Sequence, residues 1–140
     1  MNTDKMIRIG LMRKTEINHG MITSILANIE RNLHYLKNSK IDEYSSRIIT
    51  TSYYDSLRNA LEALILSEGL KTNKHEAITH YLKEKNEPRM ASEFDKLRIL
   101  RNKINYYGGE VSPQKTIEIK EKVTRMINEL RNKHLRKFVK

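Results

Sequence analysis

The chain has 140 residues, no cysteine and a formal net charge of +10. The lack of cysteine excludes disulfides, thiolate nucleophiles and cysteine-ligated metal sites, and no apolar run approaches the roughly 20 residues of a membrane span. Residues 101–140 hold eleven Lys or Arg and four Asp or Glu, a net of +7, whereas the first hundred residues hold sixteen and thirteen, a net of +3. This asymmetry favours a polyanionic partner, nucleic acid before membrane; the alternative is a solvated basic surface with no partner.

Residues 1–14 show no clean periodicity, and we expect them to form a loosely ordered arm ahead of a single helical domain over residues 15–140. The apolar stretch at residues 6–12 is too short and too interrupted for a signal peptide. Together with the lack of cysteine, this leads us to expect a cytoplasmic protein. A first helix is predicted over residues 15–38, because apolar residues recur there at helical spacing: Ile22, Ile25, Leu26, Ile29, Leu33 and Leu36.

The longest helical pattern covers residues 42–68 and ends at Gly69, the position after a helix where glycine is favoured. Its second half has a broad apolar stripe formed by Ile49, Tyr53, Leu57, Ala60, Leu61 and Leu64. Its first half directs Ile41, Tyr44 and Ile48 along a different side. Two stripes predict either one internal and one intermolecular surface, or a central helix surrounded by its own bundle.

Three more helices are predicted from their end signals. Asn73 with Glu76 resembles a reciprocal cap that starts a short helix over residues 75–85. A fourth helix begins between residues 88 and 92 and ends near residue 107, before two glycines. Ser112 followed by Pro113 starts the last helix, which runs to about residue 134. Since no alternating run predicts a strand, the fold class is all-α, an antiparallel bundle of about five helices.

Metal and cofactor sites are not predicted. The five histidines include no pair at i, i+4 spacing and no HExxH motif, and no phosphate-binding loop is present. His75 and His80 lie in the short helix and are expected at the surface. The basic end, residues 131–140, is interpreted either as a segment that follows a phosphate backbone or as frayed, solvated helix.

The fourth predicted helix carries one residue out of pattern. Its apolar residues Met90, Phe94, Leu97 and Ile104 follow a heptad spacing, and Arg101 occupies a slot where that spacing requires an apolar residue. A charge at a core-facing position is costly unless it is paired or functional. The structural interpretation is an ion pair with Asp55 or Glu62 of the long helix. On the other side of the helix, Ile99, Asn102 and Tyr106 form a candidate protein–protein surface.

Residues 101–106, Arg-Asn-Lys-Ile-Asn-Tyr, resemble the R-N-x-x-x-H signature of the HEPN family (higher eukaryotes and prokaryotes nucleotide-binding domains). The stretch at residues 52–64 is similar to the Tyr-Tyr-containing, alanine-rich helix of that family, and the order of elements matches over residues 22–134. The resemblance implies a bundle of four to five helices, commonly a two-fold dimer in which the motif helices meet. In members with the full motif it implies metal-independent RNA cleavage, with arginine stabilising phosphate charge and histidine transferring protons. Some relatives are toxins neutralised by a small nucleotidyltransferase, and others only bind nucleotides or RNA.

Arg101 and Asn102 match the family arginine and asparagine, but Tyr106 occupies the histidine position. Histidine, with a pKa of about 6.5, takes and gives protons at neutral pH, whereas tyrosine, at about 10, stays protonated and instead donates a hydrogen bond or stacks on a base. We therefore predict a homodimeric module that binds RNA or nucleotide, with weak or no nuclease activity and with a nucleotidyltransferase as a candidate partner. Its binding residues are Arg101, Asn102, Lys103, Asn105 and Tyr106.

Two other interpretations remain open. The first is a toxin-like, metal-independent endoribonuclease with Arg101 and Tyr106 as catalytic residues, in which Asn105 or Tyr106 orients the 2′-hydroxyl group. The second is an assembly protein in which Arg101 forms only a structural ion pair.

Overall fold

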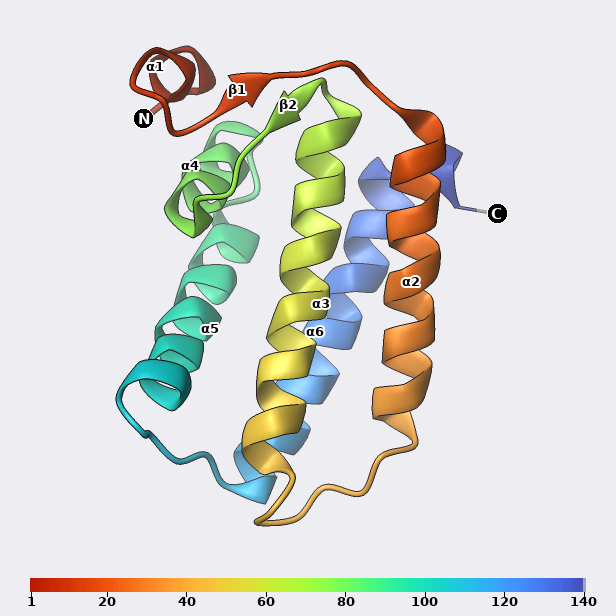
Figure 1. The fold of residues 1–140 in the computed structure, drawn as a ribbon, viewed down its shortest axis with the longest axis vertical. Helices are drawn as coiled ribbons and strands as arrows, with labels where there is room; N and C mark the ends of the chain where they lie inside the picture. The colour runs from red at the N-terminus through yellow and green to blue at the C-terminus, as the bar shows by residue number, and fades with distance from the viewer. Residues whose placement is uncertain (140) are drawn as a thin grey trace.

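The computed structural model describes residues 1–139 and confirms the all-α fold class. Helix α3 contacts α2, α5 and α6, and Figure 1 shows it at the centre, with α2 and α5 on either side and α6 behind. The described elements, in chain order, are α1 (Thr3–Arg8), β1 (Arg13–Lys14), α2 (His19–Lys37), α3 (Ser46–Ser67), β2 (Leu70–Lys71), α4 (His75–Glu84), α5 (Pro88–Tyr106), α6 (Pro113–His134) and the 3-10 turn η1 (Arg136–Phe138). Over residues 1–139, no helix combines the length and the apolar character needed to cross a membrane.

Helix α3 is buried along most of its length because other helices surround it. Its core includes the fully buried Tyr53, Leu57 and Leu61. Burying a side chain of this size contributes about 1.5–3 kcal/mol. The second half of α3 is therefore a central helix within its own bundle. Near its start the second stripe faces solvent, since Tyr44 is 84% exposed and Ile48 is 69% exposed.

The first fourteen residues differ from the expectation of a loosely ordered arm. Met6, in α1, and Met12, in the turn after it, are both buried in the core. Methionine fills irregular gaps because its side chain is unbranched and flexible, and two such contacts leave no helical periodicity in the sequence. Strand β1 pairs antiparallel with β2, with Arg13 opposite Lys71. This ladder was not predicted because two residues are too few to show alternation.

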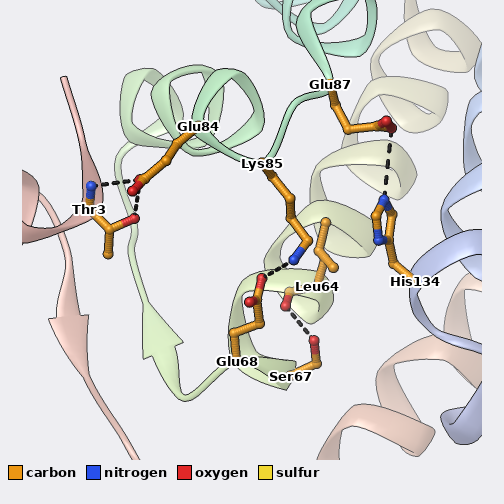
Figure 2. A network of polar contacts seen from close by, with 8 residues as sticks. All are labelled: Thr3, Leu64, Ser67, Glu68, Glu84, Lys85, Glu87 and His134. Carbon is orange, nitrogen blue, oxygen red and sulfur yellow. Dashed lines mark hydrogen bonds and ion pairs between the residues drawn. The ribbon is translucent and has the colours of Figure 1, made fainter.

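A network of polar contacts joins the helix ends near the chain's N-terminus (Figure 2). The backbone N–H of Thr3 donates to Glu84 Oε2 at 2.6 Å, which ties α1 to α4. Lys85 Nζ lies 2.6 Å from Glu68 Oε1, which ties the ends of α3 and α4. His134 Nε2 lies 3.8 Å from Glu87 Oε2, between α6 and the start of α5. Such partly exposed pairs contribute about 0–1 kcal/mol each, so they set the arrangement of the helix ends more than the stability.

The helix ends were predicted with mixed success. Gly69 has φ +75, as a residue after a helix C-terminus often does. The Ser112 side chain accepts from Lys115 N at 3.0 Å, with Pro113 at the first helical position, as expected. The reciprocal cap at Asn73 was wrong: the residue preceding α4 is Lys74, and no side chain caps this end.

The C-terminal segment is not frayed over the part that the structure describes. Leu135 and Phe138 are buried, and the Phe138 ring packs 4.8 Å from the His19 ring. Turn η1 thereby attaches the end of the chain to the start of α2.

Candidate functional site

Helix α5 distributes the residues of the Arg-Asn motif over different sides. Ile104 is buried and Arg101 and Asn102 are partly buried, whereas Lys103, Asn105 and Tyr106 are exposed. Arg101 and Tyr106 are five residues apart, which places them about 140° apart around a helix with 3.6 residues per turn. Tyr106 is 70% exposed. Within one protomer, the helix therefore does not bring the Tyr106 ring onto Arg101.

The Arg101 side chain lies against an aromatic pair. Its guanidinium carbon is 5.9 Å from the centre of the Tyr54 ring, which also stacks on Phe94 at 5.5 Å with an angle of 15° between the planes. Tyr54 is fully buried. A guanidinium at this distance from a ring is attracted by the ring's quadrupole. Tyr54 and Phe94 thus hold Arg101 at the junction of α3 and α5.

Arg101 forms no ion pair with any carboxylate of residues 1–139. Its Nε is buried and has no hydrogen-bond partner among these residues. Buried arginines are usually paired, and a buried donor without a partner costs about 1–3 kcal/mol. The unpaired state of Arg101 therefore calls for an explanation.

The two carboxylates expected to pair with Arg101 pair with Arg58 instead. Arg58 lies 3.7 Å from Asp55 and 3.7 Å from Glu62, both on its own helix α3. Burial raises the pKa of Glu62, and the nearby charge of Arg58 opposes that shift. The interpretation of Arg101 as a structural ion pair with Asp55 or Glu62 is therefore not what the structure shows.

A histidine lies beside the same tyrosine. The Tyr54 hydroxyl is 2.7 Å from His75 Nδ1, and the two rings are 5.8 Å apart. His75 is the first residue of α4 and is partly buried, which corrects the expectation of a surface histidine. No local pattern marks this contact, because Tyr54 and His75 are 21 residues apart and on different helices.

The protonation states of this pair follow from burial. Desolvation raises the pKa of Tyr54 to about 12, with Arg58 and Arg101 opposing the shift, so the phenol is protonated at neutral pH. Desolvation also lowers the pKa of His75, and the positive charges of Arg58, Arg101 and Arg98 lower it further. The imidazole is therefore neutral at pH 7.

The comparisons with known proteins assign no function to this site. A scan against family models, a search of curated proteins and a search of solved structures each found no match for this chain. The contacts of Arg101, Tyr54 and His75 therefore carry the functional argument.

A second region with many cations lies along α6. A groove of about 1240 Å³ runs between α2, the start of α5 and α6. Three of its seven lining cations are paired with carboxylates: Lys122 with Glu93 at 2.7 Å, Arg131 with Glu30, and Lys133 with Glu87. These three must give up their partners before they bind another anion, and five carboxylates line the groove, so it is the weaker candidate.

Exposed apolar side chains gather where α3 begins and α5 ends. Arg47 Nη2 donates to the backbone oxygen of Ile104 at 3.1 Å, which brings the first turn of α3 against the last turn of α5. In Figure 1, the loop between α2 and α3 and the loop between α5 and α6 lie at the same end of the bundle. The large exposed residues of this region are Tyr44, Ile48, Tyr106 and Tyr107, with Ile99 further along α5. Exposed apolar residues in such number are typical of an interaction surface.

No group of three or more metal-ligating side chains is present between residues 1 and 139.

Proposed function

We propose that the chain is a HEPN-like homodimeric module that binds RNA or nucleotide through Arg101, with weak or no nuclease activity. The observation that carries this proposal is the partly buried Arg101, which has no carboxylate partner among residues 1–139. A guanidinium presents its donors in a planar fork that matches phosphate oxygens. The resemblance at residues 101–106 and the confirmed helical bundle support the same interpretation.

The other predicted binding residues have supporting roles. Lys103 and Asn105 are exposed on α5 and can contact phosphate and sugar. Asn102 is partly buried beside them. Tyr106 offers an exposed ring on which a base can stack. This division assigns charge recognition to Arg101 and weaker, adaptable contacts to its neighbours.

The proposed homodimer uses the exposed apolar residues at the start of α3 and along α5, with Tyr44 and Ile48 at its centre. Burial of large aromatic side chains is a main source of affinity in protein interfaces. Light scattering coupled to size exclusion tests the dimer. A monomer at micromolar concentration contradicts it.

A nucleotidyltransferase partner and a role in a toxin–antitoxin pair are proposed on the family resemblance alone. A cytoplasmic location is proposed from the lack of cysteine.

Fluorescence anisotropy with a labelled single-stranded RNA, measured at two salt concentrations, tests the binding function. Binding should weaken at the higher salt, since phosphate contacts release counterions. Arg101→Ala should abolish most of the binding at low salt. The matched control is Arg125→Ala, which removes the same charge from an exposed position on α6. If the wild-type chain does not bind RNA at low salt, or if Arg101→Ala binds as the wild type does, the proposal is wrong.

The alternative function is slow, metal-independent RNA cleavage that depends on Arg101. The neutral imidazole of His75, next to the Arg101 region, favours this alternative. Cleavage should then persist with chelator and disappear in Arg101→Ala. A gain of cleavage in Tyr106→His would show that Tyr106 limits proton transfer. Absence of cleavage in the wild type, or cleavage retained in Arg101→Ala, contradicts the enzyme.

A further inference from the structure

We propose that His75 is the second half of the Arg101 site, and that Arg101 and His75 Nε2–H bind one phosphate group at the junction of α3, α4 and α5. This inference rests on the proposed function and adds a residue from a different helix. The phosphate group binds beside Tyr54 and away from the exposed ring of Tyr106.

Tyr54 fixes the position of both donors. One partner, Arg101, lies over its ring at 5.9 Å, and the other, His75, lies at its hydroxyl at 2.7 Å. The ring itself is immobilised by burial and by stacking on Phe94. Because one rigid, buried side chain contacts both groups, the spacing between the guanidinium and the imidazole is set in advance of binding, which reduces the entropy cost of binding.

In the proposed site, Tyr54 donates its hydrogen bond to His75. The Tyr54 hydroxyl is protonated, and its hydrogen-bond partner in the structure is His75 Nδ1. When the hydroxyl donates to Nδ1, the neutral imidazole must carry its proton on Nε2. The atom that faces away from Tyr54 is then a hydrogen-bond donor, as an anionic ligand requires.

The surroundings of this pair are suited to a phosphate group. Three arginine Nε atoms are buried without a hydrogen-bond partner in residues 1–139, and two of them, those of Arg101 and Arg58, belong to arginines that act on His75. The contacts of Arg58 with Asp55 and Glu62, at 3.7 Å, are too long for hydrogen bonds. A phosphate group close to these guanidinium groups accepts several N–H hydrogen bonds at once, because it has more acceptor oxygens than a carboxylate.

The N-terminal end of helix α4 also favours the binding of an anion, but more weakly. His75 is the first residue of this ten-residue helix, and no side chain caps its N-terminal end. The unpaired N–H groups and the helix dipole favour an anion near this end. The arginine and histidine geometry already defines the site, and the helix end supplements it.

Binding at this site should depend on the charge of His75. The charged and titratable groups that act on His75 are Tyr54, Asp55 and Arg58 of α3 and Arg98 and Arg101 of α5. An anion favours the imidazolium form, so binding of an RNA phosphodiester raises the pKa of His75 and strengthens as pH falls. A terminal phosphate takes up a proton at about pH 6, which opposes this trend. Loss of this pH dependence in a histidine variant is a readout that a purely structural role would not produce.

The test measures binding of adenosine monophosphate, adenosine and a short single-stranded RNA with a 5′-hydroxyl end, by calorimetry or anisotropy at pH 5.5 and 7.5. His75→Gln should weaken phosphate-dependent binding about tenfold at pH 5.5. For the RNA, whose phosphodiesters keep their charge, it should also remove the difference between the two pH values. The matched control is His80→Gln on the same helix, since His80 is also partly buried but is no partner of Tyr54. It should bind as the wild type does.

The three ligands separate the sources of phosphate. Binding of adenosine monophosphate without binding of the hydroxyl-ended RNA identifies a terminal phosphate, and the reverse identifies a backbone phosphate. Either result supports the site. Adenosine binding as tightly as its monophosphate contradicts it.

Failure of this inference can be told apart from failure of the proposed function. If RNA or nucleotide binding is lost in Arg101→Ala and unchanged in His75→Gln, then the binding function stands and the role of His75 is wrong. If the wild type binds none of the ligands, both are wrong. Nitrogen NMR of the His75 ring supplies a readout that does not depend on the variants: it should show the Nε2–H tautomer. An Nδ1–H tautomer contradicts the donor role.

Discussion

Two cationic regions of this protein differ in how their charges are satisfied. Along α6, the cations Lys122 and Arg131 pair with the carboxylates Glu93 and Glu30. On α5, Arg101 has an aromatic ring beside it and no carboxylate partner in residues 1–139. The C-terminal part of the chain has the larger excess of positive charge, but its cations Lys122, Arg131 and Lys133 already pair with carboxylates. The comparison teaches that the state of pairing, more than the number of cations, indicates where an anion binds.

The largest expected effect is on the free energy of unfolding, from a substitution in the core that both cationic regions share. Leu57 is fully buried on α3, the helix that packs against α5 and α6. Leu57→Ala should lower the free energy of unfolding by about 2–5 kcal/mol, because it removes buried apolar surface and leaves a cavity. Denaturant unfolding measures this. A loss under 1 kcal/mol would show that α3 is not the centre of the bundle.

Exchange of arginine for lysine separates charge from geometry in the two regions. Arg101→Lys should weaken RNA binding roughly five- to tenfold, since lysine keeps the charge but loses the planar fork and the contact over Tyr54. Arg131→Lys should change RNA binding less than about twofold, because Arg131 is already paired with Glu30. Anisotropy titrations at one salt concentration measure both. Equal losses of RNA affinity in the two variants would show that the two regions do not differ in anion binding.

A change of pH should alter phosphate binding at the Arg101 region through His75. Burial lowers the pKa of His75, so the free protein gains the imidazolium charge only in acidic solution. Between pH 7.5 and 5.5, phosphate binding should strengthen several-fold, on the order of the worth of one charged hydrogen bond. Repeating the titration with Tyr106→Phe should give the same pH profile. A flat profile in the wild type argues against a titrating group at the site.

The smallest effect is expected from the paired charges. A hydrogen bond from Lys122 lowers the pKa of Glu93, and Lys96 and Arg89 add to the shift. A carboxylate with a lowered pKa stabilises the fold above its unfolded pKa, and this contribution is lost as pH falls through the folded value, below about pH 4. Glu93→Gln should therefore cost at most about 1 kcal/mol at pH 7, and less at pH 3. Thermal unfolding at both pH values measures the difference.

The helices were predictable because their signals are local. Apolar spacing indicated α2, α3, α5 and α6, and Ser112 with Pro113 marked the start of α6. The N-terminal segment was not predictable, since Met6 and Met12 reach the core through tertiary contacts that leave no period in the sequence. The start of α4 at His75 was predicted, but its cap was not: Thr72 accepts from Lys74 N ahead of the helix, and Asn73 does not cap it.

For the candidate site, the sequence indicated Arg101 but not its surroundings. The apolar pattern of α5 marked Arg101 as out of place, and the ion pair expected with Asp55 or Glu62 was wrong. Arg58 lies three residues after Asp55 and four before Glu62 on one helix, a spacing at which side chains meet. Local pairing within α3 therefore takes both carboxylates. The contact between Tyr54 and His75 joins separate helices, and only the packed fold reveals it.

The central claim is that an anion binds at Arg101 and not at the cations of α6. The most direct measurement is NMR of the arginine Nε–H groups during titration with single-stranded RNA. The Nε atoms of Arg101 and Arg131 both lie buried without a hydrogen-bond partner within residues 1–139, but the guanidinium of Arg131 is paired with Glu30. The account predicts that the Arg101 signal shifts early in the titration while that of Arg131 stays in place. A shift of Arg131 with no change at Arg101 would contradict the account.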